Sequence, residues 1–137
     1  MADLSITAAN VAVTGGSESV AGTAGAAITA GQVLYRDASD GTYKLADADS
    51  ATVAARSPAG IALNSAAAGQ PVRVHIRGPV TIGATIAGGT AYFLSATAGG
   101  ICPAADLAAG DYPTIVGIAR SASVLDVRFH ESGFELA

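Results

Sequence analysis

The chain has 137 residues, the size of one domain, and a net charge of −4. Half of its residues are hydrophobic, but only 5% are aromatic and 13% are charged. This composition argues against disorder, which requires low hydrophobicity and high net charge. It also argues against nucleic-acid binding, which requires clustered lysine and arginine.

Residues 1–20 differ from the rest of the chain and predict an extended N-terminal arm. Apolar and polar residues alternate there in two short stretches around a pair of glycines. Such a segment becomes ordered only where something holds it. It lacks the basic and continuously apolar stretches of a secretory signal, so no export signal is expected. The apolar side chains that would anchor the arm to a partner are Leu4, Ile6, Val11 and Val13.

Short β-prone runs separated by turn residues predict a single β domain over residues 21–137. Their close spacing is typical of a small barrel or sandwich. In 72–77, strict alternation predicts that the valines and Ile76 face the core, while the arginines and His75 face outward. Only 46–56 and 106–109 tolerate helix. The expected strands are 32–36, 42–45, 60–63, 72–77, 80–82, 91–94, 114–119 and 124–129.

The uncharged stretch 78–105 is long enough to span a membrane. Its prolines, glycines and threonines are instead typical of strands and turns, so no membrane association is expected.

A degenerate internal repeat relates about 30–78 to about 88–131. Both segments contain a small-residue pair, a β run, a glycine turn, a Gly-Ile-Ala strand and a final alternating strand. Thus Leu34-Tyr35 recurs as Tyr92-Phe93, and Val72–Ile76 is matched with Leu125–Phe129. Two copies of a unit that cannot bury its own apolar face are expected to pair into one all-β domain with little helix.

The sequence contains no motif of an enzyme, a cofactor site or a metal site. The zinc-protease, phosphate-loop, dinucleotide-binding and serine-elbow motifs are all absent. A single cysteine, Cys102, excludes an intrachain disulfide. His75 and His130 are expected as polar strand residues. The aspartates between 37 and 49 do not have the spacing of a calcium loop and are expected as solvated turn residues.

Four arginines are weighed as candidates for an ion pair with another subunit or a partner. Arg73, Arg77 and Arg128 lie on expected strands, and Arg120 directly follows one. Arginine suits bidentate pairing with carboxylates at protein interfaces. A solvated strand face remains the alternative interpretation of these side chains.

Three segments carry a resemblance to a known family: 22–38, from Gly22-Thr-Ala-Gly to Tyr35-Arg-Asp-Ala38; 41–49; and 58–72. Together they resemble the small capsid decoration (cement) proteins of tailed bacteriophages. The resemblance covers about residues 20–130 and rests on an order of soft motifs. The N-terminal arm is the part that is poorly shared.

The resemblance implies a small, barrel-like, all-β structural protein that is not an enzyme and needs no cofactor. Such proteins bind the outer surface of the mature bacteriophage head and stabilise the capsid by clamping adjacent major capsid subunits. It implies a homotrimer at three-fold and quasi-three-fold positions of the virion, made in the host cytoplasm. Residues 2–19 would then become ordered on the capsid, or on a neighbouring decoration subunit, by adding a strand to its sheet.

An alternative is a virion-surface binding module, such as a head fibre base or a glycan- or receptor-binding domain. Glycan sites generally need exposed aromatic side chains. The chain has four tyrosines and three phenylalanines. Tyr35, Tyr92 and Phe93 lie in expected strands and are predicted to be buried, which disfavours this alternative.

Overall fold

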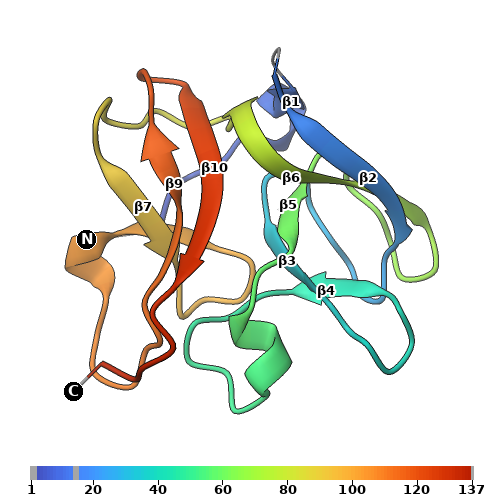
Figure 1. Cartoon of the computed structure of the whole chain (residues 1–137). Coiled ribbons are helices and arrows are strands. Elements are labelled where there is room, and N and C mark those ends of the chain that lie inside the picture. Colours follow the sequence, from blue (N-terminus) through green and yellow to red (C-terminus); the bar gives the residue numbers. More distant parts are fainter. Residues whose placement is uncertain (1–2, 14–15, 137) are drawn as a thin grey trace.

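The computed structural model describes residues 3–13 and 16–136 and is nearly all β. Its antiparallel strands form one strongly curled sheet, a half-barrel (Figure 1). The strands are β1 (Ala12–Val13), β2 (Glu18–Thr23), β3 (Val33–Arg36), β4 (Tyr43–Leu45), β5 (Gly60–Ala62), β6 (Pro71–Thr81), β7 (Ala91–Leu94), β8 (Ile101–Pro103), β9 (Thr114–Ala119) and β10 (Val124–Glu131). Three short 3-10 helices are η1 (Ala8–Asn10), η2 (Val53–Arg56) and η3 (Ala104–Asp106).

The predicted all-β class with little helix is confirmed. β7 and β9 have the predicted bounds. Of the two stretches that tolerate helix, 46–56 contains η2, whereas 106–109 shares only Asp106 with η3. β6 joins two strands that were expected to be separate, because Gly78 lets the chain bend without leaving the sheet. Its φ of 92° lies in the left-handed region that favours glycine. The prediction had no counterpart of β2 or β8.

The two halves of the chain have the same strand order. The order of strands in the sheet is β4-β3-β5-β6-β10-β9-β7-β8. From each outer edge toward the central β6–β10 pair, β4, β3, β5 and β6 therefore correspond to β8, β7, β9 and β10. The registers also correspond: Leu34 lies opposite Leu45, as Tyr92 lies opposite Pro103. We call residues 18–77 the first unit and residues 78–131 the second unit.

A close approach of two strands explains why both units contain the Gly-Ile-Ala sequence. A Cβ atom on Gly60 would lie 2.5 Å from the carbonyl oxygen of His75, and one on Gly117 would lie 2.4 Å from that of Asp126. Only glycine fits where a neighbouring backbone comes this close. His75 and Asp126 therefore occupy corresponding positions of β6 and β10.

This correspondence differs by two residues from the sequence alignment of the final strands. Ala62 lies opposite Val74 and Ala119 lies opposite Leu125, whereas the sequence alignment matched Leu125 with Val72. A shift by two residues keeps each side chain on its face of the sheet, so the hydrophobic pattern does not reveal it.

Two hydrophobic clusters form the core. The larger one combines second-unit residues with one face of the first unit, including Val33, Tyr35 and Ile61. The smaller one lies entirely in the first unit and includes Leu34, Tyr43 and Val74. As a result, β3 and β5 are buried on both faces.

Residues 3–13 lie against the chain's own core, unlike the free arm that the sequence led us to expect. The Leu4 amide donates to the Ile101 carbonyl oxygen at 2.8 Å, and the Thr7 amide donates to that of Gly83 at 2.8 Å. The Ser95 hydroxyl donates to Asp3 Oδ1 at 2.7 Å. β2 also crosses the expected boundary between residues 20 and 21.

Candidate functional site

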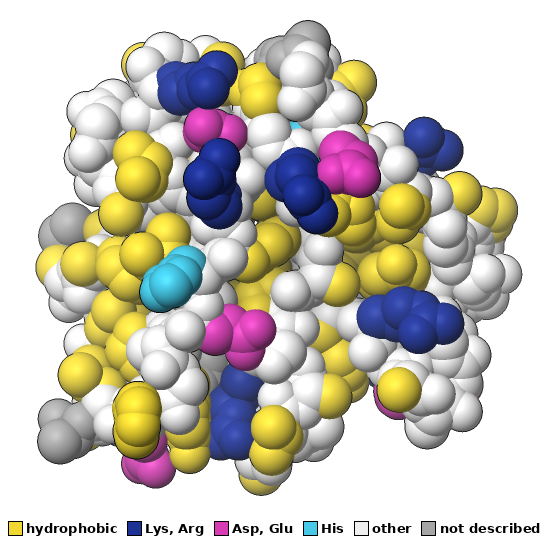
Figure 2. Space-filling view, in the orientation of Figure 1, with side chains coloured by type: hydrophobic (Ala, Val, Ile, Leu, Met, Phe, Trp, Pro, Cys, Tyr) yellow, Lys and Arg dark blue, Asp and Glu magenta, His cyan; other side chains and the backbone are white. Residues whose placement is uncertain are grey.

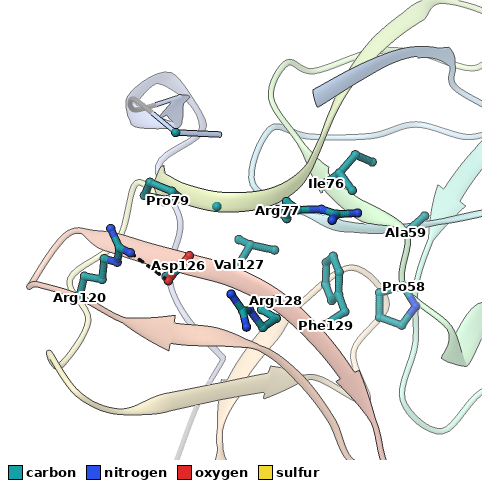
Figure 3. Close-up of a pocket in the computed structure, with 12 residues that line it drawn as sticks. Pro58, Ala59, Ile76, Arg77, Pro79, Arg120, Asp126, Val127, Arg128 and Phe129 are labelled. Atoms are coloured by element: carbon teal, nitrogen blue, oxygen red, sulfur yellow. Dashed lines mark ion pairs between the residues drawn. The ribbon is translucent and has the colours of Figure 1, made fainter. Parts of the chain in front are cut away.

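A cleft with a volume of about 800 Å³ lies beside the bend of β6. Both β5 and β10 pair with β6, but along β6 the pairing with β5 stops at His75 and the pairing with β10 starts at Gly78. The gap between them opens the cleft. Its apolar lining is drawn in Figure 3 and consists of Pro58, Ala59, Ile76, Pro79, Val127 and Phe129.

Three arginines surround this apolar lining. Arg77 Nε lies 2.9 Å from Glu18 Oε2, and an Arg120 Nη lies 3.3 Å from Asp126 Oδ2. The Arg128 side chain makes no ion pair or hydrogen bond with any residue that the structure describes. Figure 2 shows basic side chains gathered on the upper part of this face, with hydrophobic atoms between them. The cleft is thus locally cationic on an acidic protein.

A bulge in β10 positions Arg128 and Phe129. The β9–β10 register is regular up to Val127 opposite Gly117, and it resumes with His130 opposite Ile115. Two residues of β10 therefore lie opposite Val116 alone, and such bulges redirect side chains. Both residues border the cleft and also a second, shallower groove of about 470 Å³. The remaining lining of this groove is Ile115, Gly117, Ile118, Asp126 and His130.

The predicted arm anchors do not form one surface. Leu4, Ile6 and Val11 are half-buried against the chain's own core. Only Val13 projects into solvent, with 53% of its surface exposed. The first three side chains therefore help to close the core.

Of the three arginines on expected strands, the structure brings two together. Arg77 and Arg128 line the cleft, whereas Arg73 donates from Nε to the Ser19 hydroxyl at 3.1 Å and lies outside it. Arg120, which was weighed with these arginines, and Asp126, which the sequence analysis missed, also line the cleft. The signal that the sequence offers for them is modest, since both lie near the turn between the last two strands.

His75 is a correction to the predicted outward face of β6. It is fully buried, and its Nε2 lies 2.9 Å from the Gly78 carbonyl oxygen. Nδ1 is buried without a hydrogen-bond partner among the described residues. Alternation gives the side of the strand from which a side chain projects but not what covers that side, so Arg73 is exposed whereas His75, two residues later, is buried. His130, in contrast, is exposed on β10.

The turn aspartates fall into two groups with opposite pKa shifts. A hydrogen bond from Lys44, at 2.6 Å, together with bonds from Ser39, holds the pKa of Asp37 well below its usual range. Burial, followed by interaction with Asp49, raises the pKa of Asp47 to about 6. No group of three potential metal ligands occurs in the described part of the chain.

Cys102 is buried in β8, with Sγ 3.9 Å from the Leu94 carbonyl oxygen. Burial, followed by the charges of Asp3, Asp106 and Asp111, raises the pKa of its thiol to about 12. A thiol held protonated in this way is a poor nucleophile.

Tyr35 and Tyr92 are buried as predicted, and Phe93 is half-buried. Tyr43 is buried too. The fourth tyrosine, Tyr112, stacks under the Arg56 guanidinium at 3.7 Å.

Comparisons with known proteins found no match to a family model, a curated protein or a solved structure. Within residues 3–13 and 16–136, no helix has the length and apolarity needed to cross a membrane.

Proposed function

We propose that this chain is a non-enzymatic decoration protein that binds the outer surface of a mature bacteriophage head. In this role it bridges adjacent major capsid subunits, with homotrimers at three-fold and quasi-three-fold positions. The proposal rests on the resemblance in residues 20–130 and on one structural observation, the open edge of β2.

β2 pairs only with β6 within the part of the chain that the structure describes. In the second unit, the strand that corresponds to β2 is the end of β6. There Val80 lies between Leu125 and Val13, because β1 covers the outer edge. In the first unit, Val20 lies opposite Val74 alone. The same kind of edge is therefore covered by a strand in one unit and open in the other.

An open edge presents backbone N–H and C=O groups that can pair with an extended segment of another protein. β2 lies on the outside of the molecule (Figure 1). Val20 on this strand is 40% exposed. We propose that a segment of a major capsid subunit adds to this edge. Because many copies bind one lattice, a modest affinity at each site is sufficient.

The test is co-sedimentation of the purified chain with mature capsids stripped of decoration protein, with immature shells as the control. We expect saturable binding to mature capsids alone. Val20→Lys should weaken this binding, because a lysine on an edge strand opposes strand addition. The matched variant is Val53→Lys, which introduces the same charge on η2 at a side chain that is 67% exposed.

Binding to neither particle would contradict the proposal and favour the virion-surface binding module. Equal binding of the two lysine variants would contradict the role of the β2 edge. A glycan array separates the binding-module alternative further, since a glycan-binding domain would give reproducible hits.

A further inference from the structure

Corresponding faces of the two units differ in burial. Ile61 in β5 is fully buried between the units, whereas Ile118, at the same position of β9, is 52% exposed. Exposed isoleucine at a position that is covered in the other unit indicates a face that lacks its cover. In the first unit the cover is the second unit itself.

The chemistry around Ile118 indicates what would cover it. Ile118 shares its groove with Arg128 and Phe129, and these two residues also border the cationic cleft. Arg128 has no carboxylate partner in the described residues, whereas Arg77 and Arg120 each have one. An incoming group would therefore combine apolar contact with a carboxylate for Arg128.

The shape of the site favours an extended segment. All the residues that line the groove belong to the neighbouring strands β9 and β10. Nucleic acid is disfavoured, because its binding depends on neutralising many phosphates and the chain carries a net charge of −4.

We propose that the surface around the β10 bulge, formed by Ile118, Arg128 and Phe129, binds an extended, acidic segment of a partner protein. One carboxylate of the segment accepts hydrogen bonds from the Arg128 guanidinium, and a neighbouring apolar side chain covers Ile118. Arginine is suited to this role, since its planar group can bind both oxygens of a carboxylate. This surface is separate from the β2 edge and does not depend on capsid attachment.

The experiment is selection of short random linear peptides on the immobilised full chain, followed by affinity measurement of the enriched peptides. We expect enrichment of Asp or Glu next to apolar residues, and affinity that falls with added salt. Arg128→Gln should weaken binding about tenfold or more. Arg36→Gln removes the same charge at an exposed residue of β3 outside both hollows and should leave affinity unchanged.

Arg128→Lys is the second variant, because it keeps the charge but loses the planar group, and it should give an intermediate loss. NMR signals of the arginine side chains should change at Arg128 when peptide binds. Thermal unfolding of each variant establishes that it is folded.

The proposal is overturned if no peptide is enriched, if the enriched peptides are not acidic, or if Arg128→Gln binds them as well as the unmodified chain does. Sedimentation velocity tests whether a second copy of the chain occupies the surface, and heparin binding tests whether a polyanion does. Self-association that depends on Arg128 would assign the surface to a second copy of the chain. Binding of heparin through Arg128 without binding of acidic peptides would assign it to a polyanion, and either result would refute the acidic-segment proposal.

Discussion

The two units follow one strand plan but differ in what covers them. β3 and β5 of the first unit are buried on both faces, whereas β7 and β9 are buried mainly on one. The first unit is enclosed because the second unit packs against one of its faces and a cluster of its own residues packs against the other. The comparison teaches that a repeated local pattern sets strand order and register, while the neighbours of each copy set its burial.

Substitution of the corresponding glycines should give the largest effects. We expect Gly60→Ala and Gly117→Ala each to lower the free energy of unfolding by about 3 kcal/mol, because either Cβ would meet a neighbouring backbone. Denaturant unfolding followed by far-UV circular dichroism measures this. Gly88→Ala is the control, since its nearest contact would be 3.7 Å away. Strongly unequal losses at the two glycines would break the correspondence between the units.

Substitution of the corresponding isoleucines should lower the free energy of unfolding by unequal amounts, whereas substitution of the two glycines should lower it by similar amounts. Ile61→Ala removes a fully buried side chain and should cost about 3 kcal/mol of unfolding free energy. Ile118→Ala should change it by no more than about 0.5 kcal/mol, because the side chain is half-exposed. The same unfolding experiment compares them. A large loss in the Ile118 variant would mean that the second unit is covered in the isolated protein.

The loop after β4 should contribute a smaller effect that depends on pH. The pKa of Asp47 is raised from 3.8 to about 6 in the folded chain, so protonated Asp47 favours folding. This stabilisation is complete below about pH 4 and is lost as the pH rises through about 6. Asp47→Asn should therefore be more stable than the unmodified chain at pH 7, by about 1 kcal/mol after allowance for solvent screening.

Unfolding curves at pH 4 and pH 7 measure the effect, which should disappear at pH 4. Asp37→Asn provides a comparison of opposite sign, because the pKa of Asp37 is lowered and its ionised form favours folding. A gain for Asp47→Asn that is equal at both pH values would contradict the assigned cause.

Lys44 and Cys102 occupy corresponding positions of β4 and β8, opposite Tyr35 and Phe93. Lys44 reaches solvent and pairs with Asp37, whereas Cys102 is buried. We expect Cys102 not to react with a maleimide in the folded chain at pH 7.5, and to react fully in denaturant. Mass spectrometry counts the modified thiol. Rapid labelling without denaturant would mean that the β7–β8 edge opens readily.

Much of the architecture could be predicted because it follows from local chemistry. Alternating runs such as 91–94 and 114–119 predicted β7 and β9, and turn residues predicted the breaks between strands. β2 could not be predicted in this way, since Glu18–Thr23 has no apolar face and forms a strand only because β6 is beside it.

The candidate site was only partly predictable. The sequence marked Arg77 and Arg128 as residues of interest, but their proximity results from the bend at Gly78 and the bulge in β10. Leu4, Ile6 and Val11 were predicted as anchors for a partner, because a sequence shows that a side chain is apolar without showing what covers it. His75 was assigned to the wrong face for the related reason that alternation does not reveal which faces are covered.

Local sequence patterns were therefore sufficient to predict the all-β class, the positions of most strands along the chain and the likeness of the two halves. These depend on backbone preferences, side-chain alternation and turn chemistry within a few residues. Only the tertiary structure decided that residues 3–13 close the core, that Ile61 is buried while Ile118 is exposed, and that three arginines surround one cleft. These properties depend on contacts between distant segments, which a local pattern does not encode.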